Sequence, residues 1–197
     1  DGSYLAEFLL RKGYEVHGLV PNYSPSGWRN ISSLLSLVNL HQGKLEDGPL
    51  LKNLIKAIRP DEVYNLGGQN RGKASFDMPS YTTNVDAVAT LHMLEAIRLY
   101  VPDARFYQAS TSELFGKSSE VPQNEQTPFY PRSPYGVAKL YGFWTAKNYR
   151  EAYGTFACNG IAFTHTSYRQ STNYVSRKIT TALSALASGG DEVLNLG

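Results

Sequence analysis

Two spacings of apolar residues alternate along the chain. Apolar residues that return every three to four positions predict helices, and short apolar runs bounded by Gly, Pro, Asn or Ser predict strands. The predicted helices cover residues 4–10, 49–58, 82–100, 134–153 and 174–186, and the predicted strands cover residues 15–20, 38–41, 62–66, 105–109, 157–163 and 193–196, of which 62–66 reads as buried. Because helices and strands alternate, we predict an α/β fold with a doubly wound parallel sheet and right-handed crossovers.

Polar or glycine-rich segments follow three predicted strands at the point where each strand ends. They are Gly67-Gly68-Gln69, Ser110-Thr111-Ser112-Glu113 and Thr164-His165. In open parallel sheets, ligands bind beyond the carboxyl ends of the strands, so the sequence predicts one site at this edge. The glycine pair is either a plain turn or a place where a dinucleotide approaches the backbone. His165 is either a structural histidine or a member of the site.

The segment that begins the predicted helix 134–153 carries a phenol and an ammonium group. Tyr135 and Lys139 are four positions apart, so they share one face of a helix. A phenol has an ordinary pKa of about 10, which a nearby positive charge lowers, so the pair suits a base that takes a proton from a hydroxyl group. Thr111-Ser112-Glu113 adds a carboxylate that suggests a second proton transfer, although these residues could also cap a helix.

The Tyr-x-x-x-Lys spacing is not specific by itself, because the chain has fourteen tyrosines. Tyr174 and Lys178 have the same spacing, but no polar strand end precedes them in the way that Thr111-Ser112-Glu113 precedes Tyr135. We therefore interpret Tyr174 as a packing residue and Lys178 as solvated.

Composition limits the classes of function. The 197 residues suffice for about one domain, and a net charge of +2 without a long basic run argues against nucleic acid as the main partner. A small positive excess suits a phosphate-bearing small molecule. The single Cys158 excludes an internal disulfide and leaves too few ligands for a Cys/His metal site, so a reducing, cytoplasmic location fits. No apolar run predicts a membrane span, and no signal peptide is visible.

Four strings closely resemble the GDP-mannose 4,6-dehydratases, members of the extended short-chain dehydrogenase/reductase superfamily with its Rossmann-like fold. The strings are Asp1–Glu7, Tyr64–Gly67, Gln108–Gly116 and Thr127–Lys139. The likeness covers nearly the whole chain, and the last two strings are specific to the family. Related dTDP-glucose dehydratases tend to carry Asp-Glu after the threonine, where this chain has Ser112-Glu113. Nucleotide-sugar epimerases usually lack the glutamate, so Glu113 disfavours that activity.

The resemblance implies a role for each of four side chains. Tyr135 would take the proton from the C4 hydroxyl of GDP-mannose as hydride passes to NADP, and Lys139 would support the phenolate and contact the nicotinamide ribose. Thr111 would hydrogen-bond the C4 oxygen. Glu113 would remove the C5 proton as water leaves from C6, and the hydride would return to C6. The product would be GDP-4-keto-6-deoxymannose, and the reaction would be the first step towards GDP-fucose and related deoxysugars.

The resemblance also implies a cofactor site, a domain division and partners. The implied cofactor-binding residues are Asp1, Gly67, Gln69, Tyr81, Lys139 and His165. Residues 1–165 would form the NADP-binding domain, and residues 166–197 would begin the nucleotide-sugar-binding part. Helices around 82–100 and 134–153 commonly form the dimer face in this superfamily, so we expect a homo-oligomer, a dimer or tetramer, without nucleic acid, membrane or metal.

Several positions depart from the family pattern. Only Gly2 of the glycine-rich turn is present, so we expect the first strand of the sheet, which would lie between the strands at Val16 and Val63, to be missing. Most of the substrate domain would follow Gly197. Pro21 and Asn22 stand where the family carries arginines for the 2′-phosphate.

Two further positions are changed: Lys44 replaces an aspartate near the adenine, and Gln170 replaces an arginine. We therefore expect a truncated, divergent homologue whose catalytic residues are retained and whose cofactor site is eroded. The alternatives are a weakly active or inactive interaction subunit, or another nucleotide-sugar dehydratase or epimerase.

Overall fold

The computed structural model describes residues 1–21, 28–172 and 174–191. It divides into two compact units, Asp1–Phe163 and Thr164–Gly197. The domain division predicted from the sequence, after residue 165, stays a prediction. Asn22 and the strand predicted at 193–196 lie outside the described residues.

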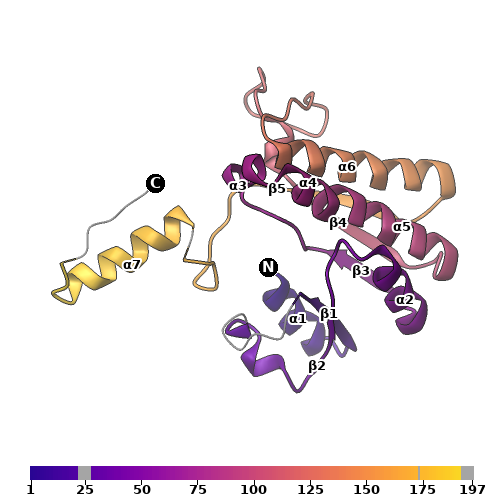
Figure 1. Cartoon of the computed structure of the whole chain (residues 1–197), viewed down its shortest axis with the longest axis horizontal. Coiled ribbons are helices and arrows are strands. Elements are labelled where there is room, and N and C mark those ends of the chain that lie inside the picture. Colours follow the sequence, from indigo (N-terminus) through magenta and orange to yellow (C-terminus); the bar gives the residue numbers. More distant parts are fainter. Residues whose placement is uncertain (22–27, 173, 192–197) are drawn as a thin grey trace. The chain divides into compact units, whose positions relative to one another are not determined.

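The described residues form parallel strands connected by helices, as the apolar spacing predicts (Figure 1). The strands are β1 (Val16–Val20), β2 (Val38–Gln42), β3 (Glu62–Asn65), β4 (Arg105–Thr111) and β5 (Ala157–Ala162). The α-helices are α1 (Gly2–Arg11), α2 (Gly48–Ile58), α3 (Gly72–Asp77), α4 (Pro79–Thr83), α5 (Ala89–Tyr100), α6 (Pro134–Tyr153) and α7 (Val175–Ala187). A π-helical turn, η3 (Asn84–Val88), joins α4 to α5, and the 3-10 helices are η2 (Ser32–Leu34) and η4 (Ser112–Leu114). The apolar spacing does not predict α3, the first turn of α4, η2 or η4.

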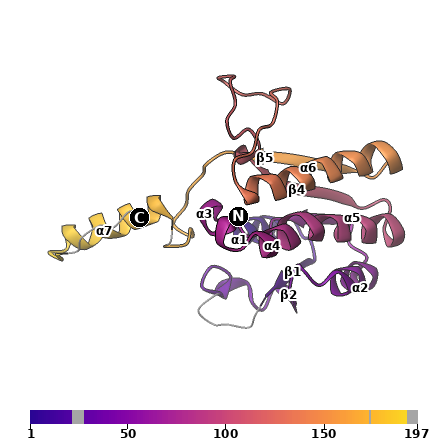
Figure 2. The ribbon, with the colours of Figure 1, turned by 45° about the horizontal axis from the view of Figure 1, so that its top comes forward.

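The strands of the first unit belong to two separate parallel sheets. β1 pairs with β2, with Val16 opposite Val38, and the second sheet has the order β3-β4-β5. In that sheet Asn65 lies opposite Gln108, and Thr111 lies opposite Ala162. After a turn of 45°, β1 and β2 still lie side by side, as do β4 and β5 (Figure 2). Within the described residues β1 and β3 do not pair, which is where the sequence predicts a missing strand.

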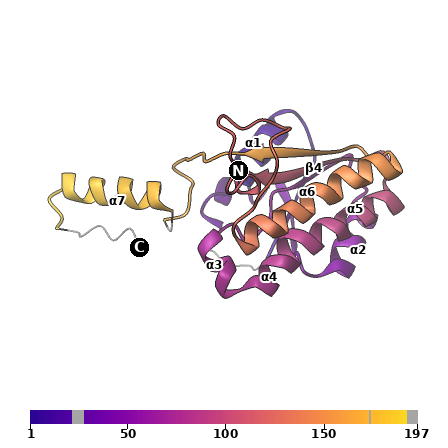
Figure 3. The ribbon, with the colours of Figure 1, turned by 90° about the horizontal axis from the view of Figure 1, so that it is seen from above.

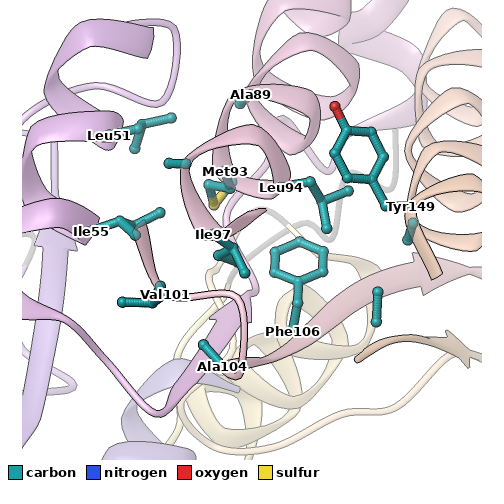
Figure 4. Packing of buried hydrophobic residues seen from close by; sticks show 13 residues of the cluster. Leu51, Ile55, Ala89, Met93, Leu94, Ile97, Val101, Ala104, Phe106 and Tyr149 are labelled. Carbon is teal, nitrogen blue, oxygen red and sulfur yellow. The ribbon is translucent and has the colours of Figure 1, made fainter. Parts of the chain in front are cut away.

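Helices α2, α5 and α6 lie side by side, and their apolar faces form the core with the second sheet (Figure 3). The core brings Leu51 and Ile55 of α2, Leu94 and Ile97 of α5, and Phe106 of β4 together (Figure 4). Phe106 and Leu94 are fully buried, and burying such a side chain contributes roughly 1.5–3 kcal/mol. The packing of these helices on the second sheet therefore places the end of β4 beside the start of α6.

Strand β3 is less buried than the sequence predicts. Tyr64 is 38% exposed, and its hydroxyl donates to Oε2 of Glu62 at 2.7 Å. The prediction of a buried strand is wrong for this residue, because successive side chains of a strand point to opposite faces of the sheet. Asn65 is 4% exposed on one face, whereas the face that carries Tyr64 is left partly open to solvent.

The second unit contains α7, with Ala182 as its buried residue. Tyr174 is the N-cap of α7 and Lys178 follows one turn later, so this Tyr-x-x-x-Lys pair begins a helix but follows no strand of the described second unit. Among the described helices of the whole chain, none is both long and apolar enough to span a bilayer.

Candidate functional site

Tyr135 and Lys139 lie in the first two turns of α6. Ser133 caps this helix, since its Oγ accepts a hydrogen bond from the Gly136 N–H at 3.0 Å, and Pro134 occupies the first turn, where it costs no hydrogen bond. Both side chains are almost fully buried, and the Lys139 Nζ lies 5.8 Å from the centre of the Tyr135 ring. The helical spacing thus places phenol and ammonium on one face, as the sequence predicts.

Thr111 and Glu113 lie where β4 ends and η4 begins. The Thr111 Oγ1 accepts from the Glu113 N–H at 3.2 Å, so the threonine does cap η4. The capping interpretation is therefore correct, and it is compatible with a site role because the cap holds Glu113 at the strand end. The Glu113 carboxylate accepts a hydrogen bond from the Ser133 Oγ at 2.8 Å. One serine thereby ties the carboxylate to the start of the helix that carries Tyr135.

Lys139 makes a buried ion pair that the sequence analysis missed. Its Nζ lies 3.3 Å from Oδ1 of Asp86 in η3 and donates to the backbone oxygen of Ala109 at 3.2 Å. Asp86 is 1% exposed, and its Oδ2 accepts from the Gln69 N–H at 3.1 Å. Burial raises the pKa of the Asp86 carboxyl, and the Lys139 charge beside it acts in the opposite direction.

A sequence signal for Asp86 exists. Thr82, Asp86 and Thr90 follow one another at intervals of four positions, and all three are buried. Such a polar stripe on the inner face of a helix indicates a buried polar network. The Asn65 amide donates to Thr90 at 3.2 Å and to Gln108 at 2.8 Å, which links the ends of β3 and β4 to α5.

Close packing surrounds the glycine pair after β3. A Cβ at Gly68 would lie 2.3 Å from Oδ1 of the buried Asp86, so this position needs glycine whatever binds there. A Cβ at Gly67 would lie 2.5 Å from the flexible end of the Leu45 side chain, which can shift. Gln69 folds back on its own loop, where its Nε2 donates to the Arg71 oxygen at 3.1 Å. The cofactor contact of Gly67 and of Gln69 stays a prediction.

The remaining predicted cofactor residues belong to other elements. Tyr81 is in α4 and is 45% exposed, and Asp1 is the exposed N-cap of α1, the helix that precedes β1. His165 belongs to the second unit. The structure therefore brings together Thr111, Glu113, Tyr135 and Lys139, with Gln69 adjacent through Asp86. Asp1, Tyr81 and His165 stay predictions.

Three departures from the family pattern lie in described residues. Pro21 is an exposed bend directly after β1, and Lys44 is exposed in the loop after β2. Gln170 accepts a hydrogen bond from the Ser176 Oγ at 2.8 Å and so helps to connect α7 to the segment before it.

The family model described as GDP-mannose 4,6 dehydratase matches residues 1–197. The GDP-mannose 4,6-dehydratase of Yersinia enterocolitica is 52% identical over 206 residues, covering 100% of this chain and 55% of that protein. The Drosophila melanogaster GDP-mannose 4,6 dehydratase is 50% identical over 207 residues, covering 100% of this chain and 52% of that protein.

Among solved structures, the dTDP-glucose 4,6-dehydratase DesIV of Streptomyces venezuelae, with NAD bound, matches with a TM-score of 0.78 at 20% identity. That match covers 96% of this chain and 59% of the other, and it confirms the doubly wound α/β fold. The chain spans about half the length of the curated relatives it matches. Since the family model matches from the first residue to the last, and relatives about half identical align over the full chain, the chain belongs to the GDP-mannose 4,6-dehydratase family.

Proposed function

We propose that this chain carries the catalytic centre of a GDP-mannose 4,6-dehydratase, a hydro-lyase that converts GDP-mannose to GDP-4-keto-6-deoxymannose and water. The observation that carries the proposal is the cluster of Thr111, Glu113, Tyr135 and Lys139, formed by the end of β4, η4 and the start of α6. Family membership adds the identity of the nucleotide sugar. The product would feed the synthesis of GDP-fucose and related deoxysugars.

The chemistry needs one base for a hydroxyl and one for a carbon acid. Tyr135 takes the C4 hydroxyl proton while Thr111 holds the C4 oxygen, and C4 becomes a ketone. The ketone acidifies the neighbouring C5–H, from which Glu113 removes a proton as the C6 hydroxyl leaves as water. A bound nicotinamide cofactor would take the hydride from C4 and return it to C6, and C5 is then reprotonated, so one water is lost overall.

The residues present fit the nicotinamide end of such a cofactor. Lys139 keeps its ammonium group beside the Tyr135 ring, and the glycine backbone at Gly68 lies directly over the Asp86–Lys139 pair. We expect NADP, as in the family pattern. Pro21 carries no charge for a 2′-phosphate, so parallel assays with NADP and with NAD decide between the two.

Substitution of Glu113 tests the assignment of the C5 base. Glu113→Gln keeps the size of the side chain and the hydrogen bond to Ser133 but cannot accept a proton. A general base contributes about 10²- to 10⁴-fold, so we expect the rate of 4-keto product formation from GDP-mannose to fall by that factor. Glu125→Gln, on the exposed part of the loop before α6, is the matched control and should leave the rate unchanged. Full dehydration by Glu113→Gln would remove the assignment.

We further propose a homo-oligomer formed through α6 and α5, in the cytoplasm. Val137, Tyr141 and Trp144 lie on one face of α6 and are 57%, 47% and 50% exposed. With Leu91 of α5 they line a shallow groove. A large apolar surface of this kind is typical of a subunit interface. The same surface supports the second candidate function, an interaction subunit, if the protein binds no cofactor.

A further inference from the structure

Asp86 is a buried carboxylate that none of the proposed chemical steps uses. We propose that Asp86 is a positioning residue for Lys139, holding the ammonium group between η3 and the end of β4 so that it stays directed at Tyr135. This inference rests on the proposed function, because Lys139 and Tyr135 act in that reaction. Asp86 itself would touch neither substrate nor cofactor.

The burial of the pair gives the first argument. Asp86 is 1% exposed and Lys139 is 4% exposed, and a buried charge is very unfavourable unless it is paired. Oδ2 of Asp86 accepts from the Gln69 N–H at 3.1 Å, and Oδ1 faces the Lys139 Nζ at 3.3 Å. A Cβ at Gly68 would lie 2.3 Å from that Oδ1 and 3.2 Å from Nζ. The pair is therefore enclosed by backbone and has little freedom to separate.

The donors of the ammonium group give the second argument. A lysine ammonium has three N–H donors on a flexible four-carbon stem. The Ala109 oxygen takes one at 3.2 Å, and Oδ1 of Asp86 attracts a second. One hydrogen bond and one ion pair thus define the position of Nζ, which lies 5.8 Å from the centre of the Tyr135 ring. With Ala109 alone, the flexible stem would allow Nζ to move.

The local backbone holds Asp86 in place. Asp86 lies in the π-helical turn η3, and π turns often occur at functional sites. The Thr90 hydroxyl donates to the Asp86 backbone oxygen at 3.3 Å, and a Cβ at Gly142 of α6 would lie 3.3 Å from the same oxygen. The turn is thus clamped between its own helix and the helix that carries Lys139.

The test compares Asp86→Asn with the unsubstituted protein in the conversion of GDP-mannose. Asn has the same size but no charge, and a misplaced catalytic group costs about 10²-fold, so we expect kcat to fall by roughly that factor with KM little changed.

A matched control separates positioning from a structural role. Thr155→Val removes a hydroxyl group at a comparably buried position, 3% exposed, between α6 and β5, and should leave kcat and KM unchanged. If Asp86→Asn lowers only the amount of folded protein and its kcat per folded molecule equals that of Thr155→Val, the proposal is overturned. The double variant Asp86→Asn/Lys139→Met removes both charges and is the better choice if Asp86→Asn folds poorly. It should be no slower than Lys139→Met alone, and a further loss of rate would contradict action through Lys139.

One readout does not depend on turnover. The freedom of the Lys139 side chain can be followed at one fixed pH by NMR relaxation of its Cε methylene, assigned with Lys139→Met. An inactive unsubstituted protein would overturn the proposed function, and the relaxation measurement would still decide the pair. Greater mobility of this methylene in Asp86→Asn supports the inference, and unchanged mobility overturns it.

Discussion

Ser133 does two things with one hydroxyl group. It accepts from the Gly136 N–H as the cap of α6 and donates to the Glu113 carboxylate. Thr111 likewise caps η4, and it is the residue predicted to hydrogen-bond the C4 oxygen of the substrate. In both cases the group that ends or begins an element also places a reacting side chain, so local folding and site geometry depend on the same bonds.

Removing the Ser133 hydroxyl should therefore affect stability and chemistry together. In Ser133→Ala we expect the free energy of unfolding to fall by about 1 kcal/mol, the usual value of an N-cap, and the C5 proton exchange to slow because Glu113 loses its donor. Denaturant unfolding and deuterium incorporation at C5 measure the two effects. Ser133→Thr keeps the hydroxyl and serves as the control. An alanine variant with unchanged exchange would mean that Ser133 only caps the helix.

The phenol of Tyr64, in β3, makes the stability of the fold depend on pH in the alkaline range. The hydrogen bond to Glu62, followed by partial burial, raises the pKa of Tyr64 to about 12. The folded protein holds the phenol proton more tightly than the unfolded chain, so the raised pKa stabilises the fold. This contribution is fully present below the ordinary pKa of about 10 and is lost as the pH rises through about 12. In Glu62→Gln we expect the phenol to titrate nearer pH 10, which ultraviolet difference titration against Tyr64→Phe can follow. An unchanged midpoint would show that Glu62 is not the cause.

At the scale of elements, α6 connects three parts of the molecule. Its first turns carry Tyr135 and Lys139, its inner face packs on β4, β5 and α5, and its outer face presents Val137, Tyr141 and Trp144. The Tyr149 hydroxyl donates to Glu95 of α5 at 2.5 Å, which locks the two helices together. Movement at an oligomer interface on α6 would thus reach the catalytic turn directly.

The proposed interface can be tested with one charge. Trp144→Glu places a carboxylate in the apolar groove of each copy, and loss of a central aromatic contact commonly costs about 2 kcal/mol or more in association. We expect the oligomer to dissociate to a monomer in sedimentation experiments. Leu37→Glu, at a site 58% exposed in another part of the first unit, is the control and should not change the assembly. A Trp144→Glu oligomer as stable as the parent would exclude this face.

At the scale of the whole molecule, we expect the division of the first unit into two sheets to be the main cause of low stability against unfolding. The helix α1 has no buried residue, and β1 has none either. The edges of β1 and β3 that are not paired within the described residues expose backbone N–H and C=O groups. The core, by contrast, is concentrated on α2, α5, α6 and β4.

We therefore predict that these 197 residues by themselves unfold in stages. Amide hydrogens of α1, β1 and β2 should exchange much faster than those of β4 and α5, because few apolar contacts hold the former. Hydrogen exchange followed by mass spectrometry measures this difference. One cooperative thermal transition with uniform protection would show that the two sheets form a single folding unit.

Local patterns in the sequence determined most elements and the residues of the proposed catalytic cluster. Apolar spacing placed the helices and strands, because each element must bury one face. Tyr135 and Lys139 meet because they are four residues apart on a helix, and Thr111 and Glu113 are two residues apart at a strand end. These relations involve neighbours in the chain, so one sequence is enough to predict them.

Only the tertiary structure decided which distant groups meet. Asp86 pairs with Lys139 because η3 packs against α6, and no spacing in the sequence encodes that contact. The exposure of Tyr64 follows from which face of β3 other elements cover, which its own apolar run does not reveal. The need for glycine at position 68 arises from the buried pair beneath it. Burial, charge pairing and close packing depend on the whole fold, whereas helical and strand periodicity are properties of the chain itself.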